Sequence, residues 1–252
     1  MRYDVNLSIL FTDLPVLARP AAARAAGFDA VEFWWPFAEA VPPSREVEAF
    51  EAAVTDAGVR LVSLNFFAGD LSAGDRGLVA WPGRQSEFRA GVEIAAGIAR
   101  RLGCRALNAL HGNFPTTDAA LANLAFAADV AAEVDAVVLV EPLSGAPDYP
   151  LRTAADVLEV VGRVGRDNVA LLADLYHLAV NGDDLDAVVS DHVDRIGHVQ
   201  VAEVPGRGAP GTGDLDVLGY LAKLEANGYR GHVGLEYRAS TGGFDWIPGK
   251  GR

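Results

Sequence analysis

The feature that most constrains the fold is a run of apolar residues that ends in an oxygen-bearing side chain. Residues 137–140 are Val-Val-Leu-Val, and Glu141 and a proline follow directly. Because this run holds no polar residue, it predicts a strand that is buried on both faces, as in a parallel sheet. Three later apolar runs have the same form and end at Asp174, Gln200 and Glu236. If these strands are parallel neighbours, the four side chains meet at one edge of the sheet.

Strands and helices alternate along the chain. We expect eight strands, over residues 3–9, 30–33, 60–65, 106–110, 137–141, 169–174, 196–201 and 232–236. We expect helices between them, over residues 14–26, 44–57, 86–102, 117–134, 153–164, 183–193 and 216–227. Gly27 and Gly58 stand where helix C-caps belong, and Ser44 is the expected N-cap of the second helix. This alternation predicts an α/β fold, a (β/α)₈ TIM barrel.

The length and continuity of the chain favour one domain. A barrel of this kind takes about 250 residues, and this chain has 252. Since no linker or change in composition divides it, we expect a single domain over residues 1–252, with a Gly-rich tail (238–252) that can be partly disordered. An open doubly wound sheet also alternates, but no GxGxxG fingerprint follows the first strand and no P-loop is present.

Charge and composition exclude several classes of function. The net charge of -13 disfavours nucleic acid as a substrate, because the protein repels polyanions. No run approaches the roughly 18 to 20 apolar residues of a membrane span, and the first residues lack the pattern of an export signal. The single cysteine, Cys104, permits no intrachain disulfide and no cysteine metal cluster. We therefore expect a cytoplasmic protein without nucleic-acid or membrane partners; a homo-oligomer is compatible with the sequence.

The four strand-end side chains predict a metal site. In a (β/α)₈ barrel the reactive groups lie at the carboxyl ends of the strands. One such carboxylate alone is equally well a helix cap or half of a salt bridge, but three around one point repel each other unless a cation lies between them. Oxygen ligands without a thiolate suit a hard ion, so Mg²⁺ or Mn²⁺ is expected at Glu141, Asp174, Gln200 and Glu236.

Several motifs, in order along the chain, resemble the hydroxypyruvate isomerase family of the xylose isomerase-like barrels. They are AGDLSAGDRGL (68–78), EFRAGVEIA (87–95), EPL (141–143), DLYH (174–177), HVQVAEVPGR (198–207), PGTGDLD (210–216) and GLEY (234–237). The resemblance implies that Glu141, Asp174, Gln200 and Glu236 hold a divalent metal and that the two glutamates are the catalytic acid/base pair. Gln200 resembles this branch, since epimerase relatives carry histidine there. Two departures are Ser144, where asparagine is frequent, and Glu203, where aspartate is common.

The residue types fit this chemistry. Moving a carbonyl along an α-hydroxycarbonyl substrate requires removal of a proton from one carbon and return of a proton to its neighbour, through an enediolate. A divalent cation stabilises the charge on the two enediolate oxygens. Carboxylates on either side of its plane can take and return the proton. Glu141 and Glu236 follow strands three apart around the barrel, so they can approach from opposing sides, with Asp174 and Gln200 chiefly as ligands.

Further residues are candidates for substrate binding. The family resemblance makes His177 a donor to a substrate oxygen; its alternative is a structural histidine. Arg207, in the glycine-flanked loop 205–213, is the candidate to hold a carboxylate with its planar fork, or else a solvated loop arginine. Glu32, at the end of a strand, is a candidate for the pocket or for an outer-shell partner of the metal, with a structural role equally compatible. Asn65 and Asn108 also stand near strand ends and can line the pocket.

One further residue and one long loop complete the expected pocket. His111 is a further candidate for its wall. The loop 66–82 is long for a compact domain, and such loops are usually functional or disordered. Arg76 and Trp81 in this loop are candidates for a lid.

These observations lead to a hypothesis and to alternatives. The leading hypothesis is a metal-assisted isomerase acting on a small hydroxy or oxo acid, with interconversion of hydroxypyruvate and tartronate semialdehyde as the type reaction. The same chemistry on a 2-oxo-tetronate, or ketose 3-epimerisation, is the nearest alternative, and pocket volume separates them. An AP-endonuclease-like enzyme is disfavoured by five histidines and the negative charge. A non-catalytic binding barrel is the remaining class.

Overall fold

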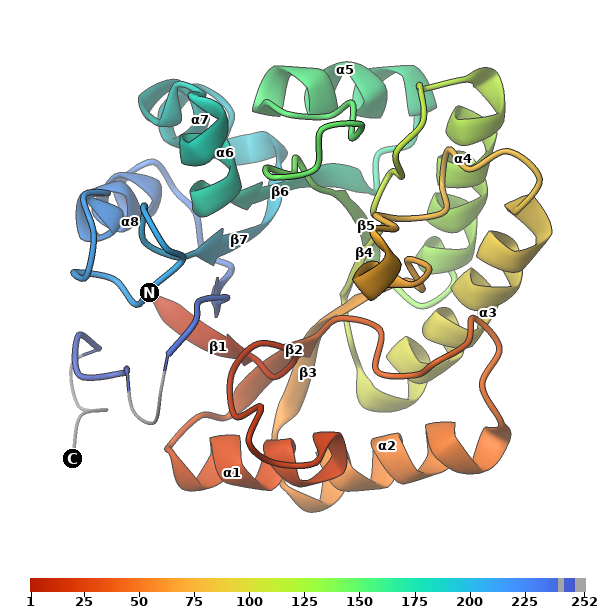
Figure 1. The fold of residues 1–252 in the computed structure, drawn as a ribbon, viewed down its shortest axis with the longest axis horizontal. Coiled ribbons are helices and arrows are strands. Elements are labelled where there is room, and N and C mark those ends of the chain that lie inside the picture. The colour runs from red at the N-terminus through yellow and green to blue at the C-terminus, as the bar shows by residue number, and fades with distance from the viewer. Residues whose placement is uncertain (240–242, 248–252) are drawn as a thin grey trace.

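Eight parallel strands close into a barrel in the computed structural model of the chain, which describes residues 1–239 and 243–247. The strands pair in chain order from β1 to β8, and β8 pairs with β1. Helices surround the barrel on the outside (Figure 1). The predicted (β/α)₈ TIM barrel is confirmed.

The elements have the following bounds. The strands are β1 Arg2–Asn6, β2 Ala30–Phe33, β3 Arg60–Asn65, β4 Ala106–Asn108, β5 Val137–Val140, β6 Val169–Asp174, β7 Ile196–Val201 and β8 His232–Leu235. The α-helices are α1 Arg19–Ala25, α2 Ser44–Asp56, α3 Gln85–Leu102, α4 Asp118–Ala132, α5 Ala154–Val164, α6 Leu175–Asn181, α7 Leu185–Asp191 and α8 Val217–Ala226. Short 3₁₀ turns are η1 Val16–Ala18, η2 Leu71–Ala73 and η3 Val193–Arg195.

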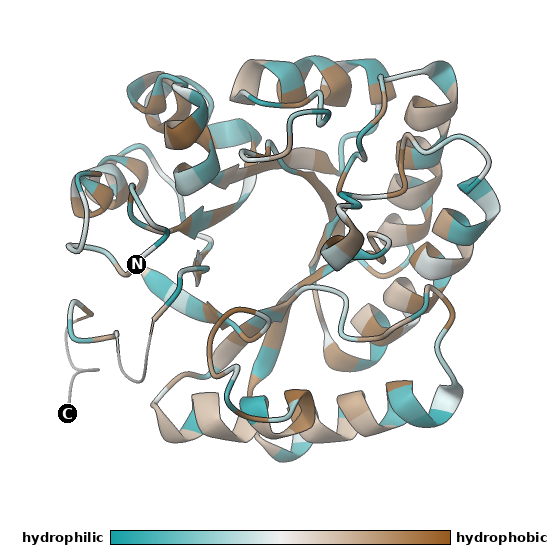
Figure 2. Ribbon diagram, in the orientation of Figure 1, coloured by the Kyte–Doolittle hydropathy of each residue, from teal (hydrophilic) through white to brown (hydrophobic). Residues whose placement is uncertain are grey.

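The core lies between the barrel and the inner faces of its helices. The apolar residues Val138, Leu139 and Val140 of β5 have no exposed surface, as their uninterrupted run predicted. Figure 2 colours much of the strand ribbon brown, whereas teal residues lie mainly on helices and loops. Helix α5 begins with a capping box in which Thr153 and Asp156 satisfy each other's backbone N–H groups. This arrangement leaves the loops at the carboxyl ends of the strands free to form a site.

Several predicted element boundaries differ from the structure. Helix 14–26 is divided into η1 and α1, because Pro20 lies in the first turn of α1 and has no N–H to continue a helix from the preceding turn. Strand β1 ends at Asn6 rather than at residue 9, since Asn6 accepts a hydrogen bond from the Ser8 N–H and turns the chain. The expectation that Ser44 is an N-cap is wrong: Pro43 is the N-cap of α2, and Ser44 is its first helical residue.

The short helix α6 was not expected. Asp174, the last residue of β6, is also its N-cap and accepts hydrogen bonds from the N–H groups of Tyr176 and His177. Asp174 uses Oδ1 for both bonds, so the cap leaves its other oxygen available. A side chain that a strand positions at the open face of the barrel therefore also orients the start of α6.

The final segment packs on the barrel where it is described. Phe244 and Ile247 are buried, and the Phe244 ring lies 4.9 Å from the Phe28 ring in an edge-on contact. The tail (238–252) was expected to be partly disordered. Residues 240–242 and 248–252 of this tail lie outside the described residues. Among the residues that the structure describes, no helix has both the length and the apolar character needed to cross a bilayer.

Candidate active site

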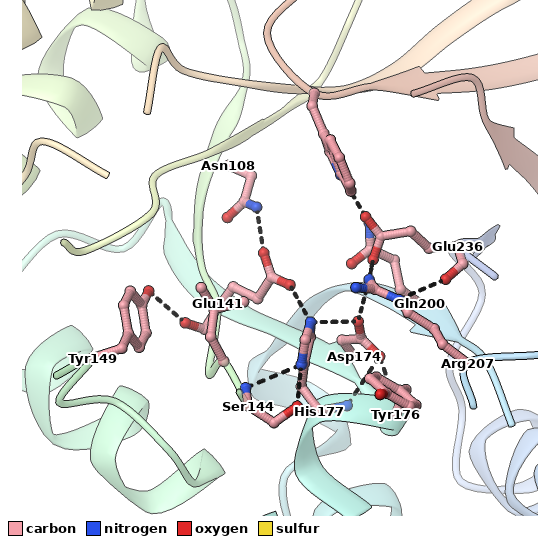
Figure 3. A network of polar contacts seen from close by, with 12 residues as sticks. Asn108, Glu141, Ser144, Tyr149, Asp174, Tyr176, His177, Gln200, Arg207 and Glu236 are labelled. Atoms are coloured by element: carbon pink, nitrogen blue, oxygen red, sulfur yellow. Dashed lines mark hydrogen bonds and ion pairs between the residues drawn. The ribbon is translucent and has the colours of Figure 1, made fainter. Parts of the chain in front are cut away.

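Four buried side chains meet at the carboxyl end of the barrel, as the strand-end pattern predicted. Glu141 follows β5, Asp174 ends β6, Gln200 lies in β7 and Glu236 follows β8; their exposed fractions are 5%, 1%, 3% and 3%. The Glu141 and Asp174 carboxylates and the His177 ring gather so closely that one atom of each lies within 4.8 Å of the others, and the two carboxylates could hold a metal ion. Figure 3 shows the Glu141 and Glu236 carboxylates on the two sides of Asp174 and His177.

Two oxygen atoms of this set lack a hydrogen-bond partner. They are Asp174 Oδ2 and Gln200 Oε1, and both are fully buried. A buried oxygen without a partner is costly, and native structures seldom leave one without a donor, a water or an ion. Carboxylate and amide oxygens are the ligands that hard divalent cations prefer. The residues present therefore fit a divalent metal ion.

The negative charge of these carboxyl groups is poorly compensated by nearby positive charge. Burial, and next the nearby Glu236 and Asp174, raise the pKa of Glu141 well above its ordinary value. Burial raises the pKa of Glu236 to about 7, although Arg207 acts in the opposite direction. Burial likewise raises the pKa of Asp174. Such shifts are the expected response of carboxyl groups that gather without enough positive charge.

Arg207 supplies part of that positive charge. Its guanidinium forms an ion pair with the Glu236 carboxylate, its Nε donates to the Glu236 backbone oxygen at 3.1 Å, and its Nη2 lies 3.6 Å from Asp174 Oδ2. The guanidinium also lies 5.2 Å from the centre of the Tyr176 ring. Arg207 was predicted to hold a substrate carboxylate. In the structure its fork faces two carboxylates of the protein instead.

His177 is oriented as a hydrogen-bond donor. The Ser144 backbone N–H donates to His177 Nδ1 at 3.0 Å, so Nδ1 is an acceptor and the proton of the neutral ring is on Nε2. Nε2 lies 3.6 Å from Asp174 Oδ2 and 4.0 Å from Glu141 Oε1. Burial, with Arg207 next, lowers the pKa of His177 to about 3. A neutral ring with this tautomer cannot ligate a metal through Nε2, but it can donate to an oxygen above the carboxylates.

Glu32 lies behind Gln200 and fixes its amide. It accepts hydrogen bonds from Gln200 Nε2 at 2.8 Å, Asn6 Nδ2 at 2.9 Å and His198 Nε2 at 2.7 Å. Asn6 Nδ2 also donates to Glu236 Oε1 at 3.1 Å. Because the Gln200 NH₂ group faces Glu32, its unpartnered oxygen is turned away from Glu32. Glu32 is not among the residues that line the cavity, so its position fits an outer-shell partner rather than a substrate contact.

We expect Glu32→Gln to weaken binding of Mn²⁺ to the metal-free protein by about 10- to 100-fold. Glutamine has one acceptor oxygen where the carboxylate has two, so it cannot accept from Gln200, Asn6 and His198 together in the present geometry, and the hold on the Gln200 amide is weakened. Isothermal titration calorimetry measures the affinity, and the exposed Glu159→Gln is the control. Unchanged affinity in Glu32→Gln would mean that Glu32 does not orient the ligand.

A cavity of about 300 Å³ lies above these carboxylates. Of the predicted site residues, it is lined by Asn65, Glu141, His177, Arg207 and Glu236. Its other walls come from residues in the surrounding loops: Trp34, Leu71, Arg76, Leu110, Leu143, Ser144 and Arg238.

Several predicted residues lie beside the cavity rather than in its lining. Asn108 donates to Glu141 Oε2 at 2.7 Å and thereby positions that carboxylate. His111 is buried and its Nε2 pairs with the Thr116 hydroxyl at 2.9 Å. Trp81, a predicted lid residue, packs against Phe114 with the two rings tilted by 47°. Asn108 thus supports the site. His111, expected in the pocket wall, and Trp81, expected in a lid, are not among the residues that line the cavity.

Trp34 and Tyr149 are site residues that were not predicted. The Trp34 indole N–H donates to Glu236 Oε1 at 2.5 Å, and the Tyr149 hydroxyl donates to the Glu141 backbone oxygen at 2.9 Å. Trp34 directly follows β2, so the strand-end rule that identified Glu236 also applies to it. Tyr149 lies in a loop, and no local pattern marks it.

Comparison with known proteins places the chain in a family. Residues 20–250 match the family model of the xylose isomerase-like TIM barrel. The chain is 48% identical to a putative hydroxypyruvate isomerase of Streptomyces coelicolor, over 100% of this chain and 97% of that protein. It is 33% identical to hydroxypyruvate isomerase of Escherichia coli, over 98% of each chain, and 34% identical to 2-oxo-tetronate isomerase of Cupriavidus necator, over 98% and 97%.

A solved structure shows the same arrangement. The crystal structure of a protein from Brucella melitensis, described as AP endonuclease, family 2, superposes with a TM-score of 0.88 at 35% identity, over 97% of each chain. With the family match over most of its length and full-length identity to these relatives, the chain belongs to the hydroxypyruvate isomerase family of the xylose isomerase-like TIM barrels.

Proposed function

We propose that this protein is a metal-assisted isomerase that interconverts hydroxypyruvate and tartronate semialdehyde. The observation that carries the proposal is the pair of unpartnered oxygens, Asp174 Oδ2 and Gln200 Oε1, between two glutamates whose pKa values are raised. Glu141, Asp174, Gln200 and Glu236 would hold the ion, Mg²⁺ or Mn²⁺. When bound, a divalent ion supplies positive charge that stabilises an enediolate.

The two glutamates move the protons on carbon. One carboxylate takes a proton from C3, the hydroxymethyl carbon of hydroxypyruvate, and a proton is returned to C2. The hydroxyl proton passes from O3 to O2, so the carbonyl moves to C3 and the formula is unchanged. Burial raises the pKa of Glu236 to about 7 in the metal-free protein, and a bound cation would lower it, so the carboxylate form that takes a carbon-bound proton would be present near neutral pH. Glu141, on the other side of Asp174, is the second acid/base group (Figure 3).

The neutral residues of the pocket orient the substrate. His177 presents its Nε2–H toward the carboxylates and can donate to the O2 or O3 oxygen. Asn65 lines the cavity next to Asn108, which holds Glu141. The apolar walls formed by Leu71, Leu110 and Leu143 limit the water around the reacting carbons.

The alternatives are separated by size and charge. A 2-oxo-tetronate uses the same chemistry with one more carbon, and a ketose 3-epimerase uses it on a neutral sugar. A nuclease needs a surface that attracts a polyanion, whereas this chain has a net charge of -13. A non-catalytic binding barrel offers no reason for two unpartnered oxygens between buried glutamates.

Proton exchange in D₂O tests the proposal. The purified protein is incubated with hydroxypyruvate, a 2-oxo-tetronate and a neutral ketose, and deuterium incorporation is followed by NMR. We expect exchange at C3 of hydroxypyruvate that EDTA abolishes and that Mg²⁺ or Mn²⁺ restores. Absence of exchange with every acid under metal-replete conditions would refute the isomerase, and metal-dependent cleavage of abasic DNA would establish the nuclease in its place.

A further inference from the structure

We propose that Arg76 binds the substrate carboxylate and makes this enzyme select acids over neutral ketoses. The inference rests on the proposed isomerase function and adds the residue that recognises the non-reacting end of the substrate. It also moves the carboxylate-binding role from Arg207 in the β7–α8 loop to the loop 66–82.

Arg76 carries a positive charge that no protein carboxylate neutralises in the described structure. It lines the cavity and is half-buried. Its Nη1 donates to two backbone oxygens, of Leu71 at 3.0 Å and of Asp75 at 2.6 Å, which are neutral acceptors. Within residues 1–239 and 243–247, Arg76 takes part in none of the ion pairs, and its Nε and Nη2 donate to no protein acceptor. One edge of the guanidinium is thus fixed and the other remains available to an anion.

The other two arginines of the cavity are less suited to this role. Arg207 is engaged by Glu236 and Asp174, as described above. Arg238 lines the cavity but is exposed, so water screens its charge. Arg76 combines partial burial, a fixed orientation and the lack of a counter-ion, which together favour recognition of a carboxylate.

The loop that carries Arg76 is fastened to its neighbour. Gly77 N–H donates to the Ala68 oxygen at 2.9 Å, and Ala80 N–H donates to the His111 oxygen at 2.8 Å. Gly77 has φ +112°, and a Cβ at this position would lie 1.9 Å from the Leu110 backbone oxygen, so only glycine fits. The Gly77 bond closes the loop on itself, and the Ala80 bond and the close approach of Gly77 to Leu110 hold the loop against the segment after β4. Arg76 is therefore positioned before a substrate enters, which lowers the entropy lost on binding.

The shape of the substrate matches this position. In hydroxypyruvate the carboxylate is attached to C2. If O2 and O3 lie near Glu141, Asp174 and Glu236, the substrate carboxylate extends away from these three residues, toward the loops that line the cavity. The guanidinium fork can pair with both carboxylate oxygens. A neutral ketose leaves Arg76 without a counter-ion in a partly desolvated site, which disfavours its binding.

Matched ligands and variants test the inference. Dihydroxyacetone differs from hydroxypyruvate only in bearing a hydroxymethyl group where the acid has its carboxylate. We expect Arg76→Gln to lower kcat/KM for exchange of hydroxypyruvate by about 30-fold or more, mainly through KM, because a charge-assisted pair is lost. Exchange of dihydroxyacetone should be unchanged or faster. Arg76→Lys should recover part of the loss, and Arg60→Gln, an arginine at the start of β3, is the control.

A binding measurement separates this inference from the proposed function. Tartronate and its neutral analogue glycerol are titrated while the intrinsic tryptophan fluorescence is recorded, to which Trp34 in the cavity wall contributes. The wild type is expected to bind tartronate more tightly than Arg76→Gln does. Loss of tartronate binding in the variant supports the role of Arg76 in acid recognition, whether or not the wild type shows isomerase activity. A wild type that binds tartronate but isomerises no acid would contradict the proposed function and leave the role of Arg76 standing. Equal losses for hydroxypyruvate and dihydroxyacetone, or unchanged tartronate affinity with an unchanged urea midpoint, would overturn the role of Arg76.

Discussion

Glu236→Gln is expected to lower kcat for hydroxypyruvate by about 10³-fold. A glutamine amide cannot accept the carbon-bound proton or return it, while its size keeps the contacts from Trp34 and Asn6 nearly in place. Glu141→Gln is expected to have a loss of the same order, because both glutamates act on one reaction path. The double variant should therefore lose little more than either single variant.

Isotope exchange assigns the two glutamates. The glutamate that takes the proton from C3 governs deuterium exchange at C3 of hydroxypyruvate, and the one that serves C2 governs exchange at C2 of tartronate semialdehyde. Glu159→Gln is the matched control, since it makes the same chemical change at an exposed glutamate that does not line the cavity. Turnover in both glutamine variants close to that of the wild type, with the metal bound, would contradict the acid/base assignment.

The barrel could be predicted because its signals are local. Apolar runs and glycine stops define strands and helices from neighbouring residues alone, and the closed order β1 to β8 follows from their alternation. The errors came where a side chain or a proline overrides that pattern. Asn6 turns the chain after β1, Asp174 begins α6, and Pro20 separates η1 from α1.

The site could be predicted only as far as strand ends identify it. Glu141, Asp174, Gln200 and Glu236 do lie together, because parallel strands bring their carboxyl ends to one face. The contacts that orient them join residues distant in sequence. Gln200 and Glu32 are separated by 168 positions, and nothing near either residue indicates the pairing. The same reason explains why the ion pair between Arg207 and Glu236 was not anticipated.

The raised pKa of Glu236 also predicts how the metal-free protein responds to pH. A carboxyl group whose pKa rises on folding binds more protons in the native state than in the unfolded chain. Stability therefore falls as the pH increases between the two values, here between 4.5 and about 7. A shift of this size corresponds to roughly 3 kcal/mol. We attribute the cost to burial of the carboxylate, which the Arg207 guanidinium compensates only in part.

Metal-free Glu236→Gln should consequently be more stable than the metal-free wild type above about pH 7, by up to roughly 3 kcal/mol, with the difference vanishing below about pH 4.5. Groups away from this cluster titrate in both proteins and cancel in the comparison, whereas removal of the Glu236 charge also lowers the raised pKa of Glu141 and so adds to the gain in stability. Urea unfolding at several pH values in EDTA measures the difference. With Mn²⁺ present the order should reverse, because the variant loses a carboxylate ligand while the ion stabilises the wild type. A stability difference that does not change with pH would show that ionisation of Glu236 does not lower the free energy of unfolding. The proposal that the metal-free site holds uncompensated negative charge would then be wrong.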